Sequence, residues 1–206
     1  MQKQNSSKRS LNFMFNSKLL IGLAISMASL VAISNFLVQF PVKYFGMENI
    51  LTYAAFTYPI TFLITDLANR KYGTFIARRV VYLGFFTGIL LTLYFSTNFD
   101  DFISIRIAIG SGTAFLVAQL LDVKVFDILR KKIWYIAPLT SSLLGSLIDT
   151  FLFFSISFYN TEVPWISLAI GDFIVKLMIS LLMLIPFRVL LKKTIPEEKE
   201  LSAKLN

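Results

Sequence analysis

Long apolar runs separated by short polar segments dominate the chain. Residues 19–40 and 80–99 contain no charged side chain, and residues 102–121 contain only one. Residues 133–159 and 165–187 are further runs, with one and two charges. A helix needs about 20 mostly apolar residues to cross a bilayer, so each of these runs predicts a membrane-spanning helix.

A sixth run, residues 50–65, is shorter and contains Pro59. Proline kinks a helix, and neighbouring helices can tolerate the kink inside a membrane. We therefore predict an all-α integral membrane protein with six transmembrane helices. Its transmembrane domain covers residues 19–187, between a first tail at residues 1–18 and a second at residues 188–206.

Composition excludes other classes of protein. Of the 206 residues 56% are hydrophobic and 16% are charged, whereas soluble domains carry about 25% charged residues. A soluble domain of this size cannot bury so much apolar surface, and a disordered chain would be more polar. Cysteine and histidine are absent, which excludes thiolate chemistry and the usual zinc sites. We predict no metal site, no cofactor and no enzymatic activity.

The net charge of +8 is distributed unevenly along the chain. Basic residues gather in both tails and in the segments after the second and fourth runs (Lys3, Lys8, Arg9, Lys18; Arg70, Lys71, Arg78, Arg79; Lys124, Arg130, Lys131, Lys132; Arg188, Lys192, Lys193, Lys199, Lys204). Because Lys and Arg favour cytoplasmic loops, both termini are predicted to be cytoplasmic. This placement at membrane boundaries favours contact with anionic lipid over nucleic acid.

Five polar side chains fall within the predicted spans, all in the half nearer the outer face. At about 1.5 Å per helical residue, Arg106, Asn35, Asp172 and Asp149 lie about 6–15 Å below that face. Lys176 lies one turn deeper than Asp172, on the same face of the same helix. Ionisable groups inside a membrane are costly and usually functional. We therefore predict one shared cavity that opens to the outside. Phe153 lies on the same helical stripe as Asp149.

Structural interpretations of these residues stay open. Asp172 and Lys176 are spaced as a salt bridge within one helix, and Arg106 could be a counter-ion to Asp100 or Asp101. Asp149 has no basic partner on its own helix, which favours a functional role or pairing with another helix.

A second polar cluster falls at the predicted cytoplasmic edge. Asp66 and Arg70 are four residues apart, and Gln119 and Asp122 end the fourth run on the same side. Helix capping and interfacial ion pairing are one interpretation. The other is an inner gate that is closed by pairs between these two segments.

Several blocks of sequence, in order, resemble the queuosine precursor transporters, which belong to the vitamin uptake transporter family of bacterial inner membranes. The blocks are spread along almost the whole chain. They are residues 34–39, residues 57–67 with Arg70 and Tyr72-Gly73, residues 77–79, 106–108, 119–126 and 137–138, Asp149-Thr150 with Phe153-Phe154, and Asp172 with Lys176 before Pro186. The resemblance implies a six-helix plan similar to the substrate-binding subunits of energy-coupling-factor transporters.

The resemblance also implies import of a 7-deazaguanine, either 7-cyano-7-deazaguanine or 7-aminomethyl-7-deazaguanine, for salvage into tRNA queuosine. The ring N–H and exocyclic amine of this substrate form a donor pair that a carboxylate of Asp149 or Asp172 can accept, as acidic residues do at base edges. Its carbonyl needs a donor such as Lys176, Arg106 or Asn35. Its faces suit stacking on aromatic side chains such as Phe153.

Other functions remain possible at this stage. The chain could be a binding subunit for another vitamin-like or purine-like solute that needs a separate energising complex. It contains no Gly-x-x-x-x-Gly-Lys-Ser/Thr loop, so this chain is not expected to hydrolyse ATP itself. An intramembrane enzyme and a scaffold are further alternatives. The energy source and the oligomeric state stay open.

Overall fold

The structure is a computed structural model that describes residues 2–95 and 99–193, with side chains for residues 20–95 and 99–191. Its elements follow in the order α1 (Gln2–Leu37), the short 3-10 turn η1 (Tyr44–Gly46), α2 (Ala54–Thr57), α3 (Pro59–Phe95), α4 (Phe102–Leu129), α5 (Ile136–Phe158) and α6 (Trp165–Lys193). These ranges contain no strand, and one isolated bridge joins Pro41 to Thr52. Residues 194–206 of the predicted second tail lie outside the described residues.

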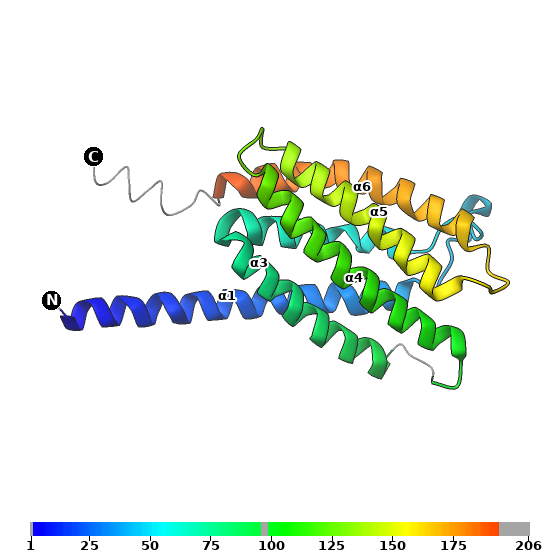
Figure 1. Cartoon of the computed structure of the whole chain (residues 1–206), viewed down its shortest axis with the longest axis horizontal. Coiled ribbons are helices and arrows are strands. Elements are labelled where there is room, and N and C mark those ends of the chain that lie inside the picture. Colours follow the sequence, from blue (N-terminus) through cyan, green and yellow to red (C-terminus); the bar gives the residue numbers. More distant parts are fainter. Residues whose placement is uncertain (1, 96–98, 194–206) are drawn as a thin grey trace.

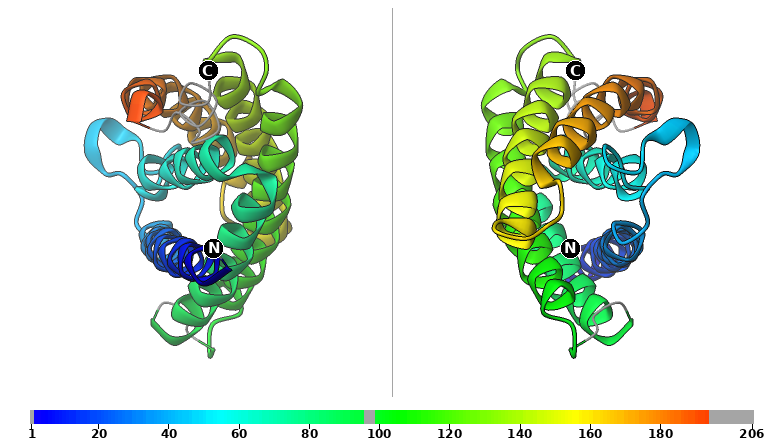
Figure 2. Two further views of the ribbon diagram at one scale, coloured as in Figure 1. Left: turned by 90° about the vertical axis from the view of Figure 1, so that its left-hand side faces the viewer. Right: turned by 90° about the vertical axis from the view of Figure 1, so that its right-hand side faces the viewer.

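The long helices form one bundle, with α4 along α5, α1 along α3, α3 against α4, and α5 against α6. The first helix begins and the last helix ends at the same end of the bundle (Figure 1). We call this the terminal end and the opposite one the distal end. Viewed along the bundle, the first half of α3 lies between α1 and α6 (Figure 2), so residues on it can face several helices.

Five helices of the described chain are long and apolar enough to cross a membrane. The sequence predicted separate helices at residues 50–65 and 80–99 with a loop between them, whereas the structure has one helical run there, α3, which is broken at Gly73. Within α3 only Gly73 departs from helical geometry, with φ 81° and ψ 173°. The chain reverses direction at this break, at the terminal end (Figure 1). Residues 66–79, predicted as a loop, are therefore helical on both sides of a one-residue turn.

Any side chain at position 73 is expected to destabilise the fold. Its backbone lies in a region that residues with a Cβ rarely adopt, and such strain costs about 1–3 kcal/mol. We expect Gly73→Ala to lower the free energy of unfolding by that amount, measured by thermal denaturation in detergent. Gly22→Ala is the matched control, because Gly22 is helical and has no neighbour within 4 Å of an added Cβ. An equal loss of stability in both variants would contradict the assignment.

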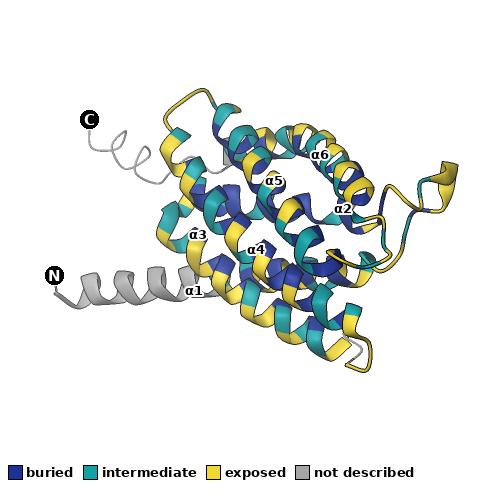
Figure 3. Ribbon diagram, turned by 45° about the vertical axis from the view of Figure 1, so that its right-hand side comes forward, coloured by how far each residue is buried: buried dark blue, intermediate teal, exposed yellow. Residues whose placement is uncertain are grey.

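The outer surface of the bundle is apolar, and its interior holds polar side chains as well as apolar ones. The outer face of α6 exposes large apolar side chains along its length (Ile166, Ile170, Ile174, Met178, Leu181, Leu182, Ile185 and Val189). The buried positions, dark blue in Figure 3, include many hydroxyl, amide and charged side chains besides apolar ones. A soluble protein does not expose apolar patches of this extent. Together with the apolar helices, this surface is that of a multi-pass membrane protein.

The segment from Val38 to Tyr53 lies at the distal end of the bundle, to one side (Figures 1 and 2), and is attached to α6; it is called the covering segment below because it lines the wide cavity. The Ser167 hydroxyl donates to the Asn49 carbonyl oxygen at 2.9 Å. One turn along, a Cβ on Gly171 would overlap the Ile50 carbonyl oxygen, so only glycine permits this close approach. The attachment places the segment over the cavities described next.

Candidate functional site

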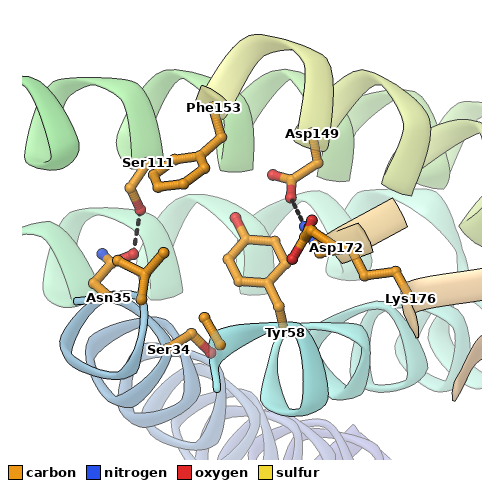
Figure 4. Close-up of a pocket in the computed structure, with 10 residues that line it drawn as sticks. Ser34, Asn35, Tyr58, Ser111, Asp149, Phe153, Asp172 and Lys176 are labelled. Atoms are coloured by element: carbon orange, nitrogen blue, oxygen red, sulfur yellow. Dashed lines mark hydrogen bonds and ion pairs between the residues drawn. The ribbon is translucent and has the colours of Figure 1, made fainter. Parts of the chain in front are cut away.

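Three charged side chains meet between α5 and α6 (Figure 4). Lys176 Nζ lies 2.8 Å from Asp149 Oδ2 and 2.6 Å from Asp172 Oδ2. The Thr150 hydroxyl donates to the same Asp172 oxygen at 2.8 Å. Each of the three charged side chains is at most 5% exposed. Lys176 thus pairs with a carboxylate on its own helix and with one on α5, and we call these residues the three-charge group.

Two polar atoms beside this group, Asp149 Oδ1 and the Tyr58 hydroxyl, are in hydrogen-bond geometry with no described residue, although the two side chains interact with each other. Tyr58 precedes α3, and its ring lies 4.9 Å from Lys176 Nζ, in range of a cation–π interaction. Most buried polar atoms in proteins are hydrogen-bonded. An unpaired acceptor and an unpaired hydroxyl next to one another are therefore suited to binding a polar ligand.

Asn35 forms the opposite wall of the site (Figure 4). Its Nδ2 donates to the Thr92 hydroxyl at 2.9 Å, and its Oδ1 accepts from the Ser111 hydroxyl. The neighbouring Ser34 shares a hydrogen bond of 2.8 Å with Thr57. Side chains of α1, α3 and α4 thereby hold the Asn35 amide in one orientation, with one Nδ2 hydrogen left over.

A small cavity of about 20 Å³ lies between these two walls. Its lining brings both polar groups together with apolar side chains (Ser34, Asn35, Val38, Ala54, Tyr58, Ser111, Asp149, Phe153, Asp172 and Lys176). A water molecule needs about 10–15 Å³ by this measure, so the space holds about one water. The inner cavity is therefore too small for a larger ligand in this conformation.

A wider cavity of about 530 Å³ lies toward the distal end and shares Val38 with the inner one. Side chains of the covering segment, of α4 and of α5 line it, including Gln39, Glu48, Asp101, Phe154 and Phe158. Small-molecule pockets commonly measure about 300–1,000 Å³. The wide cavity has the size of a ligand site, and the inner cavity lies beneath it.

Aromatic rings of α5 lie where the two cavities meet. Phe153 lines the inner cavity, and Phe154 and Phe158 line the outer one. Phe153 packs edge-on against Phe154 and Phe158, with ring centroids 5.0 and 5.9 Å apart. Of the residues predicted to bind substrate, five line one cavity together: Asn35, Asp149, Phe153, Asp172 and Lys176.

Arg106, the sixth predicted binding residue, does not line either cavity. Its Nε donates to the Ile156 carbonyl at 3.0 Å, and its Nη2 donates to the Tyr159 carbonyl at 2.9 Å. A guanidinium at the C-terminus of α5 satisfies carbonyl groups that the helix leaves unpaired. Arg106 therefore holds α4 against the end of α5.

The residues of the predicted gate lie inside helices, because α4 continues to Leu129. Gln119 joins α4 to α3: its Nε2 donates to Thr61 at 2.8 Å, and its Oε1 accepts from Thr65 at 2.6 Å. Arg70 does not pair with Asp66, since its Nη1 donates to the Arg130 carbonyl at 2.6 Å.

The remaining two gate residues, Asp66 and Asp122, are buried next to each other on α3 and α4. The two Asp66 oxygens accept from Ser141 at 3.3 Å and from Ser142 at 3.4 Å. Neither Asp122 oxygen has a donor in hydrogen-bond geometry among the described residues. The predicted cluster therefore exists as a carboxyl pair on the terminal side of the three-charge group.

Several uncharged residues of the site were not selected from the sequence. Tyr58, Thr150 and Ser111 all contact the inner cavity or its charged groups. Hydroxyl side chains are too common in membrane helices to be singled out by burial cost, unlike a charge. The available signal was position, because Tyr58 precedes Pro59 and Thr150 follows Asp149. No group of three or more His, Cys, Asp or Glu residues in the described ranges is arranged to hold a metal ion.

Comparisons with known proteins agree with this picture. Residues 52–191 match the family described as "Putative vitamin uptake transporter". The chain is 32% identical to the "Queuosine precursor transporter" of Escherichia coli K12, over 90% of this chain and 94% of that protein. Two proteins named "Probable queuosine precursor transporter" are 35% identical (Haemophilus influenzae, 76% of this chain and 79% of that one) and 30% identical (Bacillus subtilis 168, 88% of both). No solved structure matches the chain.

Proposed function

Because the chain belongs to the vitamin uptake transporter family, we propose that it imports a queuosine precursor, 7-cyano-7-deazaguanine, across the bacterial inner membrane. It is a transporter and not an enzyme. The observation that supports this substrate most directly is Asp149 Oδ1, a buried acceptor without a partner beside the inner cavity.

In this proposal Asp149 reads the donor edge of the substrate. The ring N–H and the exocyclic amine of a deazaguanine are two adjacent donors, which a carboxylate accepts as it does at a base edge. Lys176 binds both Asp149 and Asp172, so its role is to hold the carboxylates in place. The spare Nδ2 hydrogen of Asn35 and the Tyr58 hydroxyl are then the donors for the substrate carbonyl.

Aromatic side chains supply the remaining contacts. Phe153 and Tyr58 both line the inner cavity, and Phe154 and Phe158 lie above it in the wider one. Stacking of a base on an aromatic ring is worth about 1–3 kcal/mol. A flat bicyclic substrate can therefore pass from the outer aromatic side chains to the inner ones while it keeps a stacking partner.

The two cavities support entry from the distal end. The wider cavity has room for a deazaguanine, and the inner cavity does not. We infer that the structure represents a state with the inner site closed. Binding then requires the walls formed by α1 and by α5 with α6 to separate.

A membrane arrangement follows from the break at Gly73. Residues 54–72 and 74–95 would each be about 28–33 Å long as helices, close to the hydrocarbon thickness of about 30 Å. The two halves of α3 run in opposite directions (Figure 1), so we infer six crossings. Basic residues then place the terminal end in the cytoplasm and both termini inside. We propose that this plan resembles that of energy-coupling-factor substrate-binding subunits, as expected from the sequence.

Salvage of queuosine tests the function. A bacterial host that cannot make the precursor should recover queuosine in its tRNA when it carries this chain and receives nanomolar 7-cyano-7-deazaguanine. An analogue without the exocyclic amine should compete at least about tenfold more weakly, since hydrogen bonds to charged groups are worth about 1.5–3 kcal/mol. No recovery above an empty vector, with the chain present in the membrane, would refute the function.

The second candidate function is a binding subunit for a related vitamin-like or purine-like solute that needs a separate energising complex. It rests on the six crossings inferred above, because the sequence resemblance leads us to expect the same plan in energy-coupling-factor subunits. Purified chain in vesicles without ATP separates the two: uptake there supports a transporter that works alone. Substrate binding without uptake would support the subunit. Neither result changes which residues are proposed to bind the substrate.

A further inference from the structure

The carboxyl pair of Asp66 and Asp122 has no basic partner among the residues whose side chains the structure describes. Both side chains are at most 2% exposed, and they interact directly with each other. Ser141 lies beside both, and its single hydroxyl hydrogen is shared between Asp66 Oδ1 at 3.3 Å and the Pro138 carbonyl at 3.4 Å. Asp122 interacts with Ser141 and Asp66, but no described residue donates to it in hydrogen-bond geometry. The three-charge group, by contrast, contains a lysine between its carboxylates.

The surroundings of the pair contain no cation among the described residues. On α3 the nearest basic residue is Arg70, which is engaged with the Arg130 carbonyl. On α4 Lys124 is exposed, on a different face from Asp122. The side chains of α5 and α6 that contact Asp66 or line the small cavity beside it are serine, proline and apolar residues: Pro138, Ser141, Ser142, Ser180, Met183, Leu184 and Phe187.

Two ionised carboxylates cannot be buried in contact with each other without a counter-charge, because each disfavours ionisation of the other. A proton or a metal cation would relieve this repulsion. The cavity beside Asp66 is only about 10 Å³, which leaves no room for a hydrated ion. We propose that Asp66 and Asp122 share one exchangeable proton, and that this proton moves with the substrate during transport.

Buried hydroxyl groups connect the pair to the substrate cavity. Ser180 lines the small cavity beside Asp66 and lies one turn from Lys176 on α6. Ser146 lies one turn from Asp149 on α5, and Ser142 lies one turn further, in contact with Asp66. Neither the Ser180 nor the Ser146 hydroxyl has a partner among the described residues. These unpaired hydroxyls can form new hydrogen bonds when the protonation of the carboxyl pair changes, and so link the pair to the inner cavity.

The proton itself is tested by infrared spectroscopy on the purified full-length chain in lipid vesicles near neutral pH. Wild type should show the carbonyl band of a protonated carboxyl group, shifted by exchange into D₂O. The band should change in frequency in Asp66→Asn and in Asp122→Asn, and it should disappear when both residues are replaced, because a single buried carboxyl without a cation stays neutral. Asp127→Asn is the matched control, because Asp127 lies on the same helix, is exposed and pairs with Arg130. Absence of the band in wild type overturns the proposal.

Coupling is tested by uptake of 7-cyano-7-deazaguanine into such vesicles without ATP, and this part rests on the proposed function. With the outside one pH unit more acidic and the membrane potential clamped, one proton per substrate gives about tenfold accumulation. Wild type and Asp127→Asn should reach it. Asp66→Asn and Asp122→Asn should lose the gradient-driven accumulation.

The outcomes separate the two proposals. If wild type exchanges substrate across the vesicle membrane but accumulates none, or accumulates it only with a sodium gradient, proton coupling is wrong and the function stands. If wild type does not exchange the substrate at all, the proposed substrate is wrong. The infrared band then decides by itself whether the pair holds a proton.

Discussion

Replacing Asp149 by Asn should abolish uptake of 7-cyano-7-deazaguanine at nanomolar concentration and leave the protein in the membrane at its normal level. The amide has one acceptor where the carboxylate has two, and its N–H group would face the substrate donors. Loss of a charged hydrogen bond costs about 1.5–3 kcal/mol, so we expect affinity to fall by about 10–100-fold or more. Labelled substrate uptake in cells measures the effect.

The protein should remain folded because the variant keeps a compensated lysine. Lys176 would still pair with Asp172 at 2.6 Å, and Thr150 would still donate to that carboxylate. Asp127→Asn serves as the control here too, since that side chain is exposed, pairs with Arg130 and lines neither cavity. Asp172→Asn should be tested in parallel. Normal import by both single variants would show that neither carboxylate binds the substrate.

Replacing Lys176 by Met should have the largest effect on stability. The change would leave Asp149 and Asp172 buried with no cation, and breaking a buried ion pair in this way costs about 3–5 kcal/mol. We expect a much lower unfolding temperature in detergent and a reduced level in the membrane. Lys124→Met, an exposed lysine on α4, provides the control and should change neither.

A double replacement separates charge from packing. Adding Asp149→Asn to Lys176→Met removes one of the two carboxylates, so part of the lost stability should return. Neighbouring residues commonly show coupling energies of about 0.5–3 kcal/mol in such cycles. If the double variant is as unstable as the sum of the two single changes, the lysine does not act by neutralising Asp149.

The charged part of the site could be predicted because charge inside a membrane is expensive. Depth counting placed Asp149, Asp172 and Lys176 at similar levels, and spacing placed the last two on one face; the structure brings all three together. The two structural interpretations of these residues proved compatible, since Lys176 pairs both within its helix and across to α5. Asn35, selected by depth, and Phe153, selected by its helical stripe with Asp149, line the same cavity; their role in binding stays a prediction.

Other features could not be derived from the sequence. Hydropathy shows where apolar runs stop but not where helices end, so Asp122 and Arg70 were placed at span ends although both lie within helices. The one-residue reversal at Gly73 needs a specific backbone angle that composition does not reveal. Arg106 was predicted by depth alone, and its carbonyl partners on α5 become apparent only once α4 and α5 are packed.

The three-charge group has a consequence for what the transporter can reject. Two carboxylates and one ammonium leave a single negative charge in a region with little water, where electrostatic forces are strong. A nucleotide brings its own phosphate charges and would be repelled there, whereas a free base or its protonated aminomethyl form would not. Phosphorylated purines, although abundant in cells, should therefore fail to compete with the free base.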